Sequence, residues 1–202
     1  MKSIHTEPNK KDASSGKGAT MERKVMYFER KGPENTQEVL NIAKSRIKEG
    51  DIKKIVLAST RGETARAAVE VFAGLELSLV VVPWQYGFKE VNKFPREIVP
   101  EIERKGHSVH FGTMLFHTTE LYGSNTPQVI ANFLRTFGQG MKVCFEIAMM
   151  ATDGGKVDIA EKILVIAGSG QGCDTAVVMT AFPSTRYKEI KVHEILCKPL
   201  VG

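Results

Sequence analysis

The sequence is poor in cysteine, and no two cysteines stand in a Cys-x-x-C pair. The chain has three of them, Cys144, Cys173 and Cys197, which is an odd number. Disulfide-rich secreted domains usually have an even number, and structural zinc sites use closely spaced pairs. His107 and His110 do not suggest a metal site either, because a spacing of three in a strand points the two rings to opposite faces. We therefore predict no disulfide framework, no bound metal and a reducing, cytoplasmic location.

Long apolar runs are also missing. No run approaches the roughly 18 residues needed to cross a bilayer. The longest, around Leu75–Trp84, is interrupted by Glu76 and Ser78 and ends at Pro83. Lys2 is not followed by an apolar stretch, so the first residues do not have the pattern of a secretory signal. The sequence therefore predicts no membrane partner.

Positive charge is not concentrated on the body of the chain. The formal net charge is +5, but residues 1–20 contain four lysines against Glu7 and Asp12. In the body, bases and acids are interspersed, as in residues 101–105 (EIERK). Such mixing is typical of a solvated helix face and not of a surface that follows a phosphate backbone. We therefore do not predict nucleic acid as a partner.

The length of 202 residues suggests one compact domain with a modest appendage. Residues 1–20 contain no aliphatic bulk apart from Ile4, and they are rich in Lys, Ser and Gly. A segment of this composition buries too little apolar surface to fold on its own. We therefore expect a disordered extension at 1–20 and a single α/β domain at 21–202.

Apolar runs with strand character alternate with segments of helical periodicity along the rest of the chain. Ile52–Ala58 and Leu77–Val82 resemble parallel strands that are covered on both faces. Asn35 and Glu38 have the spacing of a capping box at a helix start. The expected strands are 25–28, 52–58, 77–82, 108–111, 163–167, 177–179 and 190–197, and the expected helices are 35–50, 64–74, 95–106, 126–137 and 141–151.

This alternation predicts a three-layer α/β/α fold with a mostly parallel sheet of five or six strands. The closing segment from Val177 to Cys197 leaves no room for a crossover helix, which a parallel connection requires. We therefore expect the last strand or two to run antiparallel to the rest.

The loop 59–64 (STRGET) follows a predicted parallel strand and leads into a helix. A helix N-terminus presents unpaired backbone N–H groups and the positive end of the helix dipole. Three loop residues add hydroxyl groups, Arg61 adds a charge, and Gly62 lets the backbone approach an anion closely. The pattern indicates a phosphate site. The alternative, an ordinary capped helix, explains one hydroxyl well and three poorly.

The loop 168–175 (GSGQGCDT) carries three glycines at alternate positions. It is not the dinucleotide fingerprint, because the spacing is G-x-G-x-G and the next segment, 177–179, looks like a strand. The alternatives are a loop that faces a ligand and a sharp connection between strands. Cys173 is a candidate nucleophile, but no histidine is adjacent in sequence, and a buried, inert thiol is the alternative.

A third polar segment, 112–120 (GTMLFHTTE), follows the strand expected at 108–111. Ligands of open α/β sheets bind outside the C-terminal ends of the strands. His117 is therefore a candidate base, and Gly112 and Thr113 are candidate ligand-binding residues. The alternative is a solvent-exposed turn.

Two stretches of the sequence resemble the carboxy-terminal α/β domain of pyruvate kinase. They are IVLASTRGETARAAVEVFAGLELSLVVV, and ILVIAGSGQGCDTAVVMTA with IKVHEIL. In that domain a Thr/Ser-rich loop between a strand and a helix receives the phosphate of a sugar-phosphate effector. GPENT, ASTRGETA and AGSGQGCDTA are more similar still to stand-alone archaeal and bacterial versions of the domain. The resemblance covers nearly the whole chain from Met21, but it includes no kinase barrel and none of the metal-, ADP- or phosphoenolpyruvate-binding residues, so it does not imply pyruvate kinase activity.

The resemblance implies a strand order of 3-2-1-4-5 and FMN as the cofactor. In that order strand 1 is 52–58 and strand 4 is 163–167, and the loops after them, 59–64 and 168–175, meet at a switch point. The phosphate would then lie on the first loop and the ring or ribityl chain near the second. The residues expected to bind the ligand are Glu34, Asn35, Ser59, Thr60, Arg61, Gly62, Glu63, Thr64, Gly112, Thr113, His117, Gly168, Ser169, Gly170, Gly172, Asp174 and Thr175.

Three functions stay open on the sequence. The first is a module that binds FMN or another phosphorylated small molecule. The second is an enzyme that acts on such a molecule, with His117 or Cys173 as base or nucleophile. The third is a regulatory component of a homo-oligomer.

Overall fold

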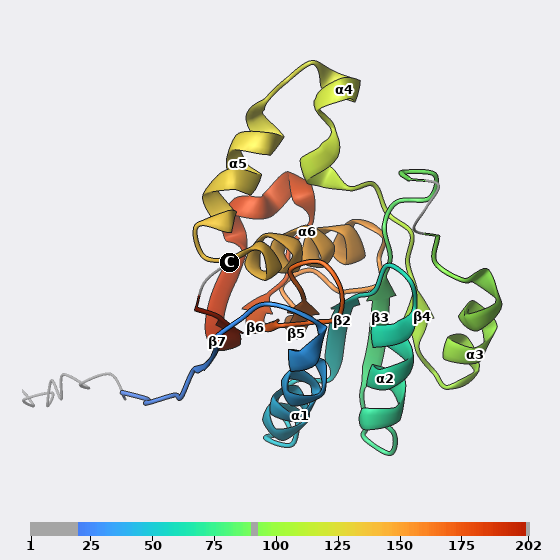
Figure 1. Cartoon of the computed structure of the whole chain (residues 1–202), viewed down its shortest axis with the longest axis vertical. Coiled ribbons are helices and arrows are strands. Elements are labelled where there is room, and N and C mark those ends of the chain that lie inside the picture. Colours follow the sequence, from blue (N-terminus) through green and yellow to red (C-terminus); the bar gives the residue numbers. More distant parts are fainter. Residues whose placement is uncertain (1–19, 90–92, 201–202) are drawn as a thin grey trace, which may run out of the picture.

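The computed structural model describes residues 20–89 and 93–200. The extension expected at 1–20 therefore lies outside the described residues, except for its last position. The described chain has an α/β fold in which helices cover both faces of one sheet (Figure 1). This confirms the predicted class, a mostly parallel sheet flanked by helices.

Within the described ranges the sheet has seven strands, in the order β1-β7-β6-β5-β2-β3-β4. Strands β2 and β5 are direct, parallel neighbours, with Ile55 opposite Leu164 and Leu57 opposite Ile166. The strands are β1 Met26–Phe28, β2 Lys54–Ala58, β3 Ser78–Val82, β4 Ser108–Val109, β5 Lys162–Ala167, β6 Thr175–Thr180 and β7 Lys191–Pro199.

Two predictions about the sheet are wrong. The expected number of strands was five or six, but the short N-terminal strand β1 also joins the sheet, in parallel with β7. The last strand or two were expected to be antiparallel to the rest, but only the penultimate strand, β6, is reversed, and the last strand is not. Because the chain reverses direction both before and after β6, strand β7 again runs in the direction of β5.

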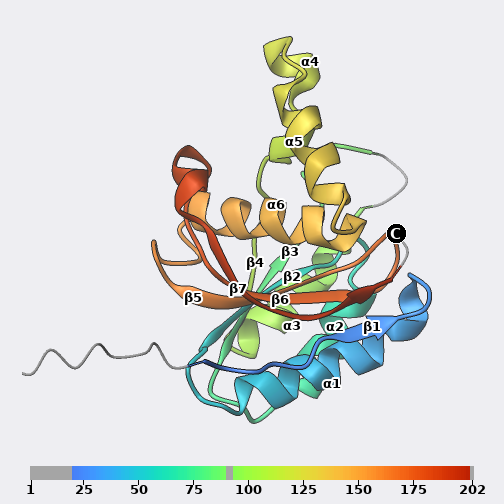
Figure 2. The ribbon, with the colours of Figure 1, turned by 90° about the vertical axis from the view of Figure 1, so that its left-hand side faces the viewer.

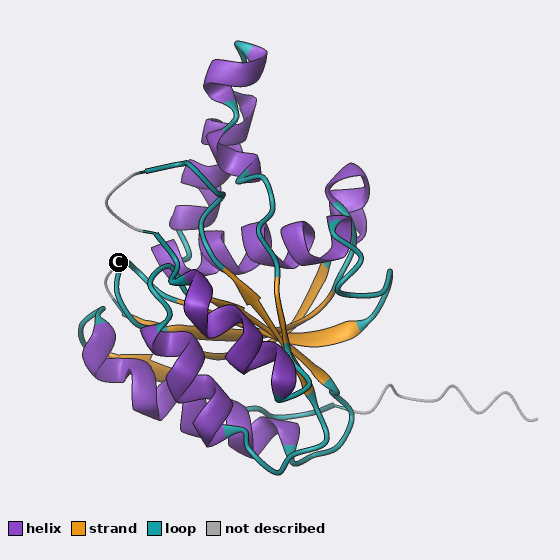
Figure 3. Ribbon diagram, turned by 90° about the vertical axis from the view of Figure 1, so that its right-hand side faces the viewer, coloured by secondary structure: helices purple, strands orange, loops and turns teal. Residues whose placement is uncertain are grey.

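The helices form two unequal layers. Helices α1 (Thr36–Ile47), α2 (Glu63–Val71) and α3 (Val99–Arg104) cover one face, and α6 (Gln139–Asp153) covers the other (Figures 2 and 3). Helices α4 (Thr119–Tyr122) and α5 (Thr126–Arg135) project beyond α6, away from the sheet (Figure 2). The 3-10 turns are η1 Pro33–Asn35, η2 Arg96–Ile98, η3 Leu115–His117 and η4 Ser184–Glu189.

Two apolar cores lie on the two faces of the sheet. Ile55 and Leu57 belong to the core shared with α1, α2 and α3, whereas Val56 belongs to the core shared with α6. Successive side chains of a strand point to opposite faces, so a continuous apolar run supplies both cores at once. None of the helices in the described ranges has the length and apolar character needed to span a membrane.

The capping box expected at Asn35 and Glu38 does not form. The Nδ2 group of Asn35 instead donates a hydrogen bond to the carbonyl oxygen of Arg30, at 2.8 Å. Asn35 already has helical backbone angles (φ −81°, ψ −11°) because the 3-10 turn η1 runs directly into α1. The extended backbone of a capping residue is therefore missing.

The fold brings several loops to one edge of the sheet. Parallel strands β2, β3 and β5 all end there, at Ala58, Val82 and Ala167. Helix α6 leads back to the start of β5, so its N-terminal end lies at the same edge (Figure 1). Open α/β sheets bind ligands at this edge.

Candidate functional site

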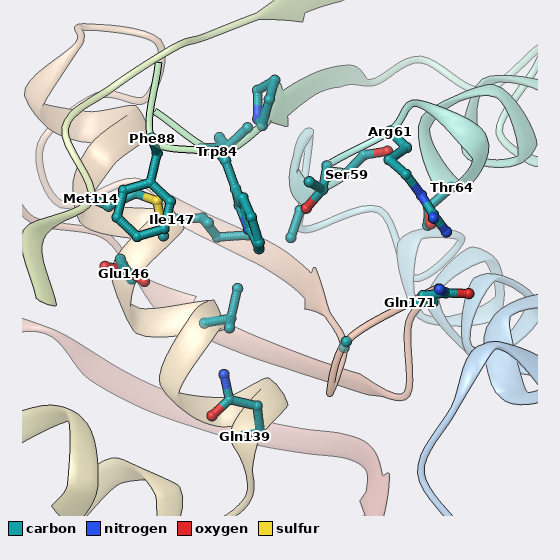
Figure 4. A pocket seen from close by; sticks show the side chains of 18 of the residues that line it. Ser59, Arg61, Thr64, Trp84, Phe88, Met114, Gln139, Glu146, Ile147 and Gln171 are labelled. Carbon is teal, nitrogen blue, oxygen red and sulfur yellow. The ribbon is translucent and has the colours of Figure 1, made fainter. Parts of the chain in front are cut away.

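A cavity of about 280 Å³ lies at this edge. Its walls come from the loops after β2, β3 and β5, from His117 in η3 and from the N-terminal part of α6. Figure 4 shows Ser59, Arg61 and Thr64 on one side, with Phe88, Met114 and Glu146 on the other. Trp84 lies between the two groups (Figure 4).

The loop after β2 provides the polar end of the cavity. The buried Ser59 hydroxyl accepts a hydrogen bond from the backbone N–H of Ala65, at 3.2 Å. It therefore satisfies one N–H group of the first turn of α2, whereas the capped-helix alternative assigned this role to Thr60 or Thr64. The backbone N–H groups of Glu63 and Thr64 have no hydrogen-bond partner in the described part of the chain. Free N–H groups at the start of a nine-residue helix can bind an anion.

Arg61 and Gly62 give this loop its charge and its shape. The Arg61 side chain is 40% exposed and lies 3.5 Å from the Glu63 carboxylate, so it can turn toward a bound anion. Gly62 has a left-handed backbone (φ +91°), and a Cβ there would lie 2.5 Å from a methyl carbon of Ile98. Glycine is required at this position for both reasons. Gly62 itself does not line the cavity.

The glycine loop after β5 forms a second wall. Gly168, Gly170 and Gly172 line the cavity. A Cβ on Gly172 would clash with the hydroxyl of Thr36 and with Pro33, so the loop packs closely against the segment before α1. This close approach is the physical reason for glycine at 172.

Asp174 stabilises the glycine loop through hydrogen bonds. Its carboxylate is fully buried and accepts hydrogen bonds from the Ser169 backbone N–H, at 3.1 Å, and from the Thr175 hydroxyl, at 2.9 Å. The Ser169 hydroxyl oxygen is buried and has no hydrogen-bond partner among the described residues. Ser169, Asp174 and Thr175 thus shape the loop without lining the cavity.

Three titratable side chains meet on the wall formed by α6 and η3. Lys142 and Glu146 are each only 2% exposed and form an ion pair of 2.5 Å, from Lys142 Nζ to Glu146 Oε2. The other carboxylate oxygen, Oε1, accepts the backbone N–H of Phe116 at 2.9 Å and lies 3.3 Å from His117 Nδ1. All three side chains line the cavity.

The surroundings keep the Glu146 carboxyl ionised. Burial raises the pKa of this carboxyl, but the hydrogen bond from His117 and the charge of Lys142 together outweigh burial and lower it. Burial also lowers the pKa of Lys142, and the attraction of Glu146 opposes that shift. The result is a buried carboxylate with a partner for each oxygen.

Aromatic rings continue this wall. Trp84 and Phe88 meet edge to face with centroids 5.6 Å apart, and Phe88 meets the His117 ring in the same way at 5.2 Å. Lys89 lies over the Trp84 ring, 5.7 Å from its centroid. The cavity therefore has a polar end, with free backbone N–H groups and Arg61, and an end lined by rings.

The structure brings together most, but not all, of the residues that the sequence singles out. Gly112 and Thr113 line a separate apolar groove on another side of α6. Glu34 and Asn35 belong to η1, which lies behind the glycine loop. The predicted residues that do line the cavity are Ser59, Thr60, Arg61, Glu63, Thr64, His117, Gly168, Gly170 and Gly172.

Cys173 is not placed to act as a nucleophile. Its side chain is fully buried, and its sulfur lies 3.8 Å from the carbonyl oxygen of Thr36. Burial raises the pKa of the thiol to about 12, so the reactive thiolate is scarce at neutral pH. The buried-thiol alternative agrees with this placement.

Sequence reasoning missed part of the cavity wall. Lys142 and Glu146 stand four residues apart in a segment that is otherwise apolar, and this spacing was the available signal. Trp84 and Phe88 follow the apolar run of β3 and carried no motif. Gln139 and Gln171 also line the cavity.

Comparison with models of known protein families gives no match for this chain. No group of three or more His, Cys, Asp or Glu side chains within residues 20–89 and 93–200 is arranged to hold a metal ion.

Proposed function

We propose that this protein binds a phosphorylated small molecule in the cavity, and that FMN is the ligand. The observation that carries the proposal is the pair of unpartnered backbone N–H groups at Glu63 and Thr64. They open into a cavity that also receives the Arg61 guanidinium and the Thr60 side chain. Backbone N–H groups, a helix dipole and a guanidinium together form a typical phosphate site.

The rest of the cavity suits the remaining parts of FMN. Trp84, Phe88 and His117 offer ring faces and edges for a flat heteroaromatic ring. The side chains of Gln139 and Gln171, which line the cavity, can hydrogen-bond to a hydroxyl-bearing chain. The volume of about 280 Å³ lies just below the usual range for small-molecule sites, about 300–1,000 Å³, so FMN would not be fully enclosed.

The proposal extends to the family that the sequence resembles. A stand-alone relative of the pyruvate kinase carboxy-terminal domain would use the loop 59–64 for phosphate without any kinase chemistry. A homo-oligomer is part of the same proposal, because exposed apolar side chains such as Leu121, Val129 and Phe133 cluster on the projecting helices α4 and α5.

Titration of FMN fluorescence with wild-type protein and the Arg61→Ala variant tests the proposal. Loss of one charge-assisted hydrogen bond should weaken FMN binding roughly tenfold to a hundredfold. Arg66→Ala is the matched control, because Arg66 is an exposed arginine of α2 that does not line the cavity. Equal FMN affinity of the wild type and Arg61→Ala would remove Arg61 from the site, and absence of FMN binding by the wild type would reject FMN.

A further inference from the structure

We infer that His117, Glu146 and Lys142 form a subsite that accepts a hydrogen bond from an N–H group on the ring of the phosphorylated ligand. The inference rests on the proposed function, because the phosphate must lie at the loop 59–64 for the ring to reach the opposite wall. It assigns the ligand class as a planar heteroaromatic ring that carries both a phosphate-bearing chain and a ring N–H group.

The first step is the state of Glu146. Its two carboxylate oxygens are occupied by Lys142, Phe116 and His117 at hydrogen-bond or ion-pair distance. A buried carboxylate with charged and backbone donors stays ionised, and an ionised carboxylate accepts hydrogen bonds without donating any.

The second step is the tautomer of His117. Because Glu146 Oε1 can only accept, the proton of the neutral imidazole lies on Nδ1, which is 3.3 Å from that oxygen. The Nε2 atom then has a free lone pair. His117 lines the cavity with 30% of its side chain exposed, and Nε2 has no hydrogen-bond partner among the described residues. Nε2 is therefore an acceptor available to a ligand donor.

The third step is the shape of this wall. The Trp84, Phe88 and His117 rings follow one another edge to face. A planar ring in contact with them gains aromatic packing and can direct its edge at His117. An aliphatic sugar phosphate would gain the phosphate contacts alone.

Charged groups from several elements surround His117. Glu146 and Lys142 face it from α6, and Lys89 lies above Phe88, the ring that contacts His117. Arg135 of α5 acts on the same network through its charge on Lys142.

FMN titrations of wild type, His117→Phe and His117→Gln at pH 7.5 test the subsite. At pH 7.5 His117→Phe should bind FMN about three- to tenfold more weakly than wild type, whereas His117→Gln, which keeps an acceptor, should lose less.

His193→Phe is the matched control, because His193 is an exposed histidine of β7 that does not line the cavity. Competition of inorganic phosphate with FMN should give the same phosphate affinity in wild type and His117→Phe. Equal FMN affinities of these two proteins at pH 7.5 would overturn the subsite and leave the proposed function standing. Absence of FMN binding by the wild type would overturn both.

Nitrogen-15 spectra of the ligand-free protein give a readout that does not depend on FMN. The wild type should show His117 protonated on Nδ1 at pH 7.5, and Glu146→Gln should reduce that preference, because an amide can also donate. A wild-type spectrum with the proton on Nε2 would overturn the inference.

Discussion

Two ionic networks lie at opposite edges of the sheet, and they differ in how completely their polar atoms are paired. At the edge where the parallel strands begin, the Arg46 guanidinium of α1 bonds to Asp51 just before β2 and to Glu194 of β7. At the edge where they end, Lys142, Glu146 and His117 line the cavity.

The networks resemble one another in burial but differ in completeness. The Arg46 side chain is 4% exposed and directs its donors at the Asp51 and Glu194 carboxylates, with N–O distances between 2.6 and 3.0 Å. Its partners all belong to the protein, so the network ties α1 to the sheet. His117 instead leaves Nε2 open toward the cavity. An ionic network that leaves an atom unpaired in a cavity indicates a site for a ligand. A network whose atoms are all paired within the protein indicates a role in the stability of the fold.

Lys142→Ala should have the largest effect on stability. It leaves Glu146 buried without its cationic partner, which should lower the free energy of unfolding by about 3–5 kcal/mol. Urea unfolding followed by circular dichroism measures the loss. The double variant Lys142→Met with Glu146→Leu is the control, because removal of both charges should restore most of the stability. A loss in the single variant below about 1 kcal/mol would mean that water reaches Glu146 and that the pair is not buried in solution.

Arg46→Ala should have a smaller effect, because Asp51 is 43% exposed and can be solvated after the change. We expect a loss of about 2 kcal/mol, mostly from the hydrogen bonds to Glu194, whose side chain is only 10% exposed. FMN affinity should not change, because this network lies at the other edge of the sheet. A tenfold loss of FMN affinity would contradict the division between the two edges.

The pH dependence of unfolding sharpens the same comparison. Hydrogen bonds from Arg46 and then Lys162 lower the pKa of Asp51 below its usual range. A lowered acid pKa gives stability that is complete above the unfolded pKa, about 3.9, and is lost as the pH falls toward the folded pKa. Between pH 5 and pH 2, wild type should therefore lose more unfolding free energy than Arg46→Ala. Equal losses of unfolding free energy in the two proteins would contradict the assignment of Asp51 to this network.

Lys162→Ala should have the smallest effect. Lys162 contacts Asp51 at 2.5 Å, but the two side chains are 37% and 43% exposed. An ion pair this exposed contributes about 0–1 kcal/mol, and salt screens it. Thermal unfolding at low and high salt measures the difference from wild type, which should shrink as salt is added. A loss above 2 kcal/mol would place Lys162 in the closed network with Arg46.

The elements of the fold followed from local patterns in the sequence. The apolar runs of β2 and β3 and the periodicity of α1 predicted their type, because these patterns report burial directly. The pairing of β1 was not predictable in this way, since it depends on contacts between residues more than 160 positions apart, such as Met26 and Cys197. The direction of β7 depends on its pairing with β6, which a local apolar pattern does not report. The capping box failed because a 3-10 turn precedes α1.

The candidate site was predictable where its residues lie in one loop. The loop 59–64 and the glycines of 168–172 carry their signal in consecutive residues, and both line the cavity. The wall of Trp84, Phe88, Lys142 and Glu146 is assembled from a loop and a helix that are far apart in sequence. Gly112 and Thr113 illustrate the opposite error, because residues after a strand can turn to either side of a covering helix.

The central claim is that the cavity holds its ligand by the phosphate group. Parallel titrations of wild-type protein with FMN and with riboflavin, which lacks the phosphate, test it most directly. The Glu63 and Thr64 N–H groups and Arg61 should make FMN bind at least about tenfold more tightly than riboflavin, because each charge-assisted hydrogen bond contributes about 1.5–3 kcal/mol. Equal affinities for the two flavins would contradict the claim.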